Sequence, residues 1–337
     1  MKVGWLVPGF PGTGGGRINA IIFNELIRLG VDLHIFSSNG IMDTRWIPTM
    51  GLDSGMNSKV KDIKELGEKW DGVLVTSDFG PKEVLLKYLD QTEAKLKIFY
   101  VILMNRDIIQ RLRQNDLLVV SSTPYFYRQL GGYGCTNNVM LVGPSDDNNF
   151  YPLGAQYHRN NLCLTFPKKS GWVVVDAFKI AQVHEDDMLA APMGLGEEKW
   201  EGVRLCEWSL PAHDVGGLRT LYSKCRMFIC SDGGAQWGFN YSLAEAALCQ
   251  LPIVSTDWEG FEHIVENNVT ALAVPWNHAP CEPWNEWMVR PSPLELGMRM
   301  IELYRNKELA ERLARNARER VLQYNVKDWC RKFKELL

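Results

Sequence analysis

The sequence has no apolar run of the roughly 18 residues that a membrane-spanning helix needs. Its opening strand-like stretch, residues 2–7, stops at Pro8 and is too short for the core of a signal peptide. None of its eight cysteines forms a Cys-x-x-Cys pair, and several lie in apolar runs, as buried thiols do. These absences predict a cytoplasmic protein with reduced cysteines and no disulfide framework.

A surplus of positive charge is absent as well. Lys and Arg number 37 against 40 for Asp and Glu, which leaves a formal net charge of −3. Dedicated nucleic-acid-binding proteins carry a strong basic surplus, so we expect no nucleic-acid partner. Apolar residues make up 46% and charged residues 23%, a mixture that excludes disordered and collagen-like chains.

The length of 337 residues suits two domains of about 150 residues each. Short apolar runs alternate with helical patterns along the whole chain, which predicts parallel β-α units. The predicted strands are residues 2–7, 31–36, 72–76, 97–102, 117–122, 139–142, 161–165, 188–191, 203–207, 227–230, 253–255 and 271–274. The clearest predicted helices are residues 17–29, 171–182, 215–223, 241–249 and 261–266.

Turn-forming residues gather at 143–157 and indicate a domain boundary. We therefore predict an α/β protein with two Rossmann-like, doubly wound domains, over residues 1–145 and 146–320. Residues 321–337 are predicted to form a helix that packs back on the N-terminal domain. The tail from residue 293 onward is rich in Lys and Arg. Its interspersed Glu residues favour a solvated face, and weak peripheral contact with anionic lipid is the other interpretation.

A glycine-rich loop joins the first predicted strand to the first predicted helix and contains Gly14 and Gly15. Its amides can approach an anion or a sugar closely, because glycine has no Cβ and a helix N-terminus favours negative charge. Arg17 stands where a dinucleotide-binding fingerprint has its third glycine, and no Gly-Lys-Ser/Thr follows as in a Walker loop. A flexible β-α turn is the alternative interpretation.

The segment after the strand at 227–230 is the most informative part of the chain. A glycine-containing loop leads into a helix that we expect to begin near Asn240 or Tyr241, with its first amides at the carboxyl ends of the strands. Such amides suit a diphosphate. Glu245 lies about 6 Å further along the axis, near the separation between a nucleotide's diphosphate and its ribose diol. The alternative is a glutamate that only caps or solvates an alanine-rich helix.

Several motifs resemble the retaining glycosyltransferases of family 4, which have the GT-B fold of two Rossmann-like domains facing across a cleft. In the C-terminal half these motifs are Gly238-Phe239 followed by Glu245-Ala246, the Leu-Pro-Ile-Val-Ser-Thr-Asp run at 251–257, and residues 265–275. Residues 142–152 resemble the family's interdomain segment, and Pro167-Lys168-Lys169 resembles its phosphate-binding lysine loop. The N-terminal half matches only through the glycines and Arg at 14–17 and its α/β pattern.

The resemblance implies a hexosyltransferase-like enzyme of class EC 2.4 with Lys169 and Glu245 as its catalytic pair. The implied donor-binding residues are Gly14, Gly15, Lys168, Lys169, Trp237, Gly238, Phe239, Asn240, Tyr241, Ser242 and Glu245. Two positions depart from the family pattern. The first Glu of its Glu-x7-Glu pair falls on Trp237, and an Arg five residues before the lysine at 169 falls on Leu164. Trp237 is either an aromatic wall for the donor sugar or a plug in a site that binds without catalysing.

The implied reaction transfers a sugar from a nucleotide-sugar to an acceptor hydroxyl with retention of anomeric configuration. The acceptor is a saccharide, a lipid-linked molecule or a protein. The sequence contains no Asp-x-Asp pair and no clustered His/Cys ligands, so we expect no metal cofactor. Two alternatives stay open: a catalytically impaired nucleotide-sugar-binding subunit or scaffold, and a nicotinamide-dependent dehydrogenase, which rests on fold analogy alone.

Overall fold

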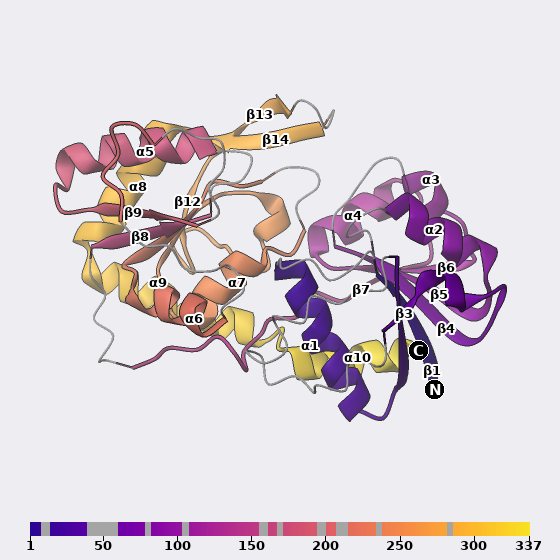
Figure 1. Cartoon of the computed structure of the whole chain (residues 1–337). Helices are drawn as coiled ribbons and strands as arrows, with labels where there is room; N and C mark the ends of the chain where they lie inside the picture. The colour runs from indigo at the N-terminus through magenta and orange to yellow at the C-terminus, as the bar shows by residue number, and fades with distance from the viewer. Residues whose placement is uncertain are drawn as a thin grey trace. The chain divides into compact units, whose positions relative to one another are not determined.

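The computed structural model of the chain describes residues 1–7, 14–38, 60–77, 82–102, 108–154, 161–166, 171–193, 200–206, 215–233, 238–281 and 286–337. The chain divides into two compact units (Figure 1). Unit 1 comprises Met1–Pro144 together with Tyr324–Leu337, and unit 2 comprises Ser145–Gln323.

Unit 1 is built on a seven-stranded sheet in which the strand order is β3-β2-β1-β4-β5-β6-β7. All neighbouring strands run parallel. The strands are β1 (Lys2–Val7), β2 (Asp32–Ser37), β3 (Val60–Asp62), β4 (Lys69–Ser77), β5 (Glu93–Val101), β6 (Leu117–Ser121) and β7 (Asn138–Met140). The helices are α1 (Gly14–Arg28), η4 (Ile63–Leu66), α2 (Lys82–Gln91), α3 (Ile109–Leu112), α4 (Pro124–Gly132) and α10 (Val326–Leu336).

The last helix of the chain, α10, packs in unit 1 beside α1 (Figure 1). Its ring of Phe333 lies 5.4 Å from that of Trp5 on β1, and Trp5 also meets Phe23 of α1 at 5.0 Å. Trp329 stacks on Phe333 with their centroids 4.9 Å apart. Lys334 donates a hydrogen bond to the carbonyl of Leu29 at 2.7 Å. Burial of these rings fixes α10 to the first β-α unit, since aromatic side chains bury large apolar areas.

Unit 2 contains a five-stranded parallel sheet of order β12-β11-β10-β8-β9 and a separate hairpin, β13-β14. The strands are β8 (Leu162–Thr165), β9 (Leu189–Pro192), β10 (Met227–Cys230), β11 (Ile253–Thr256), β12 (Leu272–Val274), β13 (Trp276–Cys281) and β14 (Glu286–Pro291). The helices are α5 (Gly171–His184), α6 (Val215–Lys224), α7 (Tyr241–Leu248), η6 (Glu259–Phe261), α8 (Pro293–Arg305) and α9 (Lys307–Leu322).

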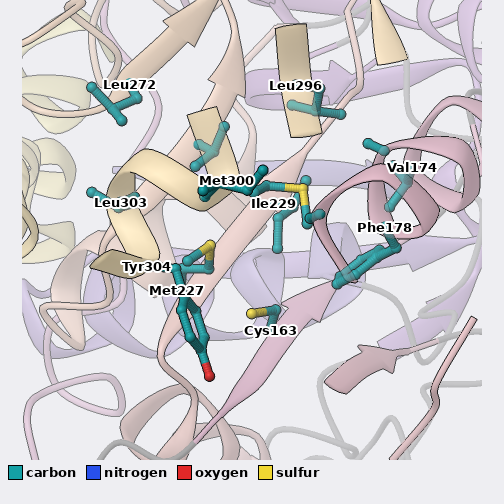
Figure 2. Packing of buried hydrophobic residues seen from close by; sticks show 14 of the residues in the cluster. Cys163, Val174, Phe178, Met227, Ile229, Leu272, Leu296, Met300, Leu303 and Tyr304 are labelled. Atoms are coloured by element: carbon teal, nitrogen blue, oxygen red, sulfur yellow. The ribbon is translucent and has the colours of Figure 1, made fainter. Parts of the chain in front are cut away.

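One face of this sheet is covered by α5 and α8, whose apolar side chains share a core with the strands. Figure 2 shows Val174 and Phe178 of α5, Met300 of α8 and Ile229 of β10 in this cluster, and each is at most 1% exposed. The two helices approach closely at Gly297, where a Cβ would lie 2.9 Å from the carbonyl oxygen of Ala177. Strands that are buried on both faces have continuous apolar sequences. The strands of this sheet could therefore be predicted from the sequence.

Several predicted elements differ from the observed ones. Helix α1 begins at Gly14 rather than near residue 17. The predicted helix over 261–266 is wrong: only the short η6 forms, and the Thr270 hydroxyl accepts from the Glu266 amide and donates to the Ile264 carbonyl. Within the described part of 203–207 no strand forms, because the Arg204 amide donates to the Gln182 side chain and Leu205 makes only an isolated bridge.

Candidate functional site

The strand order of unit 2 places its first strand, β8, between β9 and β10. After β8 the chain adds β9 on one side of that strand, and it then adds β10 on the other side. The position between β8 and β10 is therefore a topological switch point. Ligands of such sheets bind outside the carboxyl ends of the strands at that point. Thr165 pairs with Ile229 near these ends, so the segments that follow β8 and β10 start at neighbouring positions.

Helix α7 follows β10 and begins beside this edge of the sheet. Asn240 is its N-cap, and the Asn240 side-chain oxygen accepts a hydrogen bond from the Leu243 amide at 3.2 Å. The Asn240 side-chain Nδ2 atom donates to the Cys230 sulfur at 3.6 Å, which connects the cap to the end of β10. The helix begins at Tyr241, as the sequence predicted. Its first turn thus carries the positive end of the helix dipole at the strand edge.

Glu245 lies one turn into α7 and is only 6% exposed. The hydroxyl of Tyr222, on α6, donates a hydrogen bond to its Oε2 atom at 3.0 Å. The same hydroxyl lies 3.4 Å from the carbonyl oxygen of Ser242. A buried carboxylate without hydrogen bonds is costly, so Tyr222 compensates part of the desolvation. Glu245 is therefore not a solvated surface glutamate, and the sequence left that alternative open.

Aromatic rings surround Tyr222 and fix its position. The ring contacts those of Phe150 at 5.8 Å, Phe166 at 6.1 Å and Phe228 at 6.1 Å. Phe228 belongs to β10, and Phe166 comes directly after β8 and before the predicted lysine loop. The partner of Glu245 is thus held by the two strands that form the switch point.

The residue before the helix cap, Phe239, packs against two rings. Its centroid is 5.0 Å from that of Tyr241 and 5.0 Å from that of His263. Burial lowers the pKa of His263 to about 3, and the positive charge of Arg320 adds to this effect. His263 is consequently neutral near pH 7 and serves as a packing partner for the start of α7.

The loop after β10 is braced by the hairpin. The amide of Val289 on β14 donates to the carbonyl of Gly233 at 3.3 Å. A Cβ at position 233 would lie 2.0 Å from the Val289 Cγ2 atom, so a larger residue there would force the neighbouring segments to shift. The ring centroids of Trp276, on β13, and Trp258 lie 5.4 Å apart. The indole N–H of Trp276 donates a hydrogen bond to the Asp257 carbonyl at 2.7 Å. The hairpin, which sequence reasoning missed, thereby fixes where the chain leaves β10.

The structure brings part of the predicted set together. Gly238, Phe239, Asn240, Tyr241, Ser242 and Glu245 gather at the start of α7. Lys168, Lys169 and Trp237 lie outside the described residues. Gly14 and Gly15 open α1 of unit 1. Leu164, which takes the place of a family Arg, is fully buried in β8 and supplies no charge. Sequence reasoning did not identify Tyr222, because no spacing rule links it to a carboxylate 23 residues away.

Within the described ranges, no set of three His, Cys, Asp or Glu side chains is placed to hold a metal ion. None of the helices in the same ranges has the length and apolar character needed to cross a membrane. The cysteines whose side chains the structure describes are free thiols.

Comparisons with known proteins agree with this architecture. Residues 185–282, which include β9, β10 and α7 with Glu245, match the family described as glycosyl transferases group 1. A sequence search found no matching curated protein.

Solved structures match over the whole chain. A glycosyltransferase from Rickettsia africae has a TM-score of 0.66 at 13% identity, with 99% of this chain and 97% of that chain covered. HepE from Anabaena, in complex with UDP and glucose, has a TM-score of 0.70 at 12% identity, with 100% of this chain and 99% of that chain covered. Sucrose-phosphate synthase from Thermosynechococcus elongatus has a TM-score of 0.65 at 12% identity, with 99% of this chain and 98% of that chain covered. The fold is therefore α/β with two Rossmann-like domains, as in GT-B glycosyltransferases.

Proposed function

We propose that the protein is a glycosyltransferase that moves a sugar from a nucleotide-sugar donor to an acceptor hydroxyl. The match of residues 185–282 to group 1 glycosyl transferases supports this proposal. The structural similarity to HepE, which was crystallised with UDP-glucose, supports a nucleotide-sugar as the donor. The proposal includes retention of anomeric configuration, a mechanism without a metal cofactor, and action in the cytoplasm, where free thiols stay reduced.

The single observation that carries the proposal is the placement of Glu245. It is a buried carboxylate one turn inside a helix whose amino end lies at a switch point. A ligand with its diphosphate at Tyr241 and Ser242 would bring its ribose about 6 Å further along the axis, beside Glu245. The carboxylate accepts hydrogen bonds from both ribose hydroxyls.

The remaining donor contacts in the proposal come from the sequence. Lys168 and Lys169 neutralise the diphosphate, and Trp237 forms an aromatic wall beside the donor sugar. Gly14 and Gly15 are the proposed donor contacts of the N-terminal half, since glycine lets backbone amides come close to a ligand. The acceptor is a saccharide, a lipid-linked molecule or a protein.

The chain's contribution to catalysis is stabilisation of the departing nucleoside diphosphate. Breaking of the glycosidic bond runs ahead of attack by the acceptor, so negative charge develops on the leaving group. Helix-terminal amides and the Lys169 ammonium, already oriented, stabilise that charge better than water does. Glu245 holds the nucleotide so that the anomeric carbon is in place.

Purified protein should release nucleotide from at least one sugar donor in a panel that includes UDP-glucose when saccharide acceptors are added. Glu245→Ala should lose this activity, whereas Glu302→Ala, which removes a surface ion pair with Arg299, should keep it. Saturable donor binding without turnover over a broad acceptor panel would instead identify a binding subunit. Absence of any nucleotide-sugar binding would overturn the proposal.

A further inference from the structure

Tyr222 occupies a position that the transfer chemistry does not use directly. It lies on α6, is fully buried, and directs its hydroxyl to Oε2 of Glu245 at 3.0 Å. The hydroxyl also lies 3.4 Å from the Ser242 carbonyl, in the first turn of α7. The phenol therefore contacts both the helix start and the carboxylate that are assigned to the donor.

We infer that Tyr222 is a positioning residue that holds the Glu245 carboxylate in the orientation needed to accept the ribose hydroxyls of the nucleotide. This inference rests on the proposed function. A glutamate has three rotatable side-chain bonds, and an ordered ligand contact loses affinity if these bonds must be fixed on binding. A hydrogen bond from a rigid ring fixes them beforehand. An ionised carboxylate has about four lone-pair positions, so a carboxylate can accept a hydrogen bond from a phenol and hydrogen bonds from a diol at the same time.

The ring itself cannot move readily, because Phe150, Phe166 and Phe228 enclose it. Phe228 is part of β10 and Phe166 follows β8, so the hydroxyl position is set by the strands that also position α7. The orientation of Glu245 is consequently tied to the sheet rather than to its own helix alone.

Stability alone does not explain the Tyr222–Glu245 pair. Replacing both partners of a buried hydrogen bond by apolar groups of similar shape is often nearly neutral. A phenylalanine and an apolar helix residue would serve packing equally well at this place. The presence of a buried phenol beside a buried carboxylate therefore points to a requirement for the carboxylate's geometry.

Tyr222→Phe removes the hydroxyl and keeps the ring in its aromatic surroundings. Affinities are measured by calorimetry for UDP, GDP and ADP, and for the 2′,3′-dideoxy form of whichever binds most tightly. We expect Tyr222→Phe to raise the Kd for the ribonucleotide about tenfold and to leave the Kd for the dideoxy form within about twofold. If Tyr222 had only a structural role, the substitution would raise the Kd of both ligands by the same factor.

The matched control is Tyr304→Phe. Tyr304 also donates from a mostly buried hydroxyl to a carboxylate, that of Asp187, at 2.9 Å. Asp187 lies before β9, at the amino edge of the sheet and away from α7. Tyr304→Phe should leave both affinities unchanged, while a similar effect of the two substitutions would overturn the inference.

Glu245→Asp provides a test that leaves the aromatic cluster intact, should Tyr222→Phe fail to fold. Shortening the side chain withdraws the carboxylate from the Tyr222 hydroxyl, so the preference for ribose over dideoxyribose should fall about tenfold. A full ribose preference in Glu245→Asp would contradict the inference. Failure of the wild-type protein to bind any of the three nucleotides would instead contradict the proposed function.

Discussion

The ring of Phe239 stacks on the ring of His263, with centroids 5.0 Å apart and planes inclined by 27°. Phe239 is the residue before the N-cap of α7, and His263 follows η6. Both side chains are buried. An uncharged imidazole thus supports the start of the helix that we assign to the nucleotide, and its charge state links the stability of this region to pH.

Stability should rise with pH between about 3 and 6.5 because of His263. Its pKa is lowered from 6.5 to about 3, so the unfolded chain binds the proton more tightly throughout that window. Between pH 7 and pH 5 the wild-type protein should lose about 2 kcal/mol of unfolding free energy that His263→Gln does not lose. Urea denaturation at the two pH values measures this difference, and equal losses in both proteins would refute it.

Gly233→Ala should destabilise unit 2. Its new Cβ would lie 2.0 Å from Val289 Cγ2, so β14 or the loop after β10 has to shift, at a cost of about 1–3 kcal/mol. Val289→Ala in the same chain should recover part of that loss. Gly131→Ala, where a Cβ meets nothing within 4 Å, is the control. Thermal melting curves of the four proteins test the contact, and an unchanged midpoint in Gly233→Ala would exclude it.

Cysteine reactivity should follow burial. Burial raises the pKa of Cys163 and of Cys330, which keeps both thiols protonated and shielded. Cys206 is only half-buried. Iodoacetamide labelling followed by mass spectrometry should modify Cys206 well before the other two, which should react only on unfolding. Labelling of Cys330 as fast as Cys206 would be inconsistent with the packing of α10.

Lys169→Ala should weaken binding of a nucleoside diphosphate about tenfold and leave binding of the corresponding nucleoside unchanged, since its role is to neutralise phosphate charge. Lys179→Ala is the control, because Lys179 lies on α5 and pairs with Asp176 at 3.3 Å. Calorimetry with UDP and uridine makes the comparison. A parallel loss for both ligands would show that the lysine acts on the fold rather than on the diphosphate.

Much of the architecture could be predicted from the sequence, because strands of doubly wound sheets are buried on both faces and appear as short apolar runs. The start of α7 was predictable for a local reason: Asn240 is a strong N-cap residue before an alanine-rich stretch. The helix predicted over 261–266 failed because the Thr270 hydroxyl bonds the same backbone groups that a helix would use.

The hairpin and the partner of Glu245 could not be predicted. Residues 276–291 contain three prolines, and proline is unfavourable inside a strand. The hairpin is stabilised by contacts with Gly233 and Trp258, which are distant from it in sequence. Tyr222 lies in the helix predicted over 215–223, and nothing in the sequence links its hydroxyl to a carboxylate. Only the packing of α6 against α7 brings its hydroxyl to the carboxylate.

The most direct test of the account is a crystal structure of the protein soaked with a mixture of nucleotide-sugars. The diphosphate should lie within hydrogen-bonding distance of the Tyr241 and Ser242 amides, and both ribose hydroxyls should donate to Glu245. A ligand bound elsewhere, or side chains filling the space beside the start of α7, would contradict the assignment.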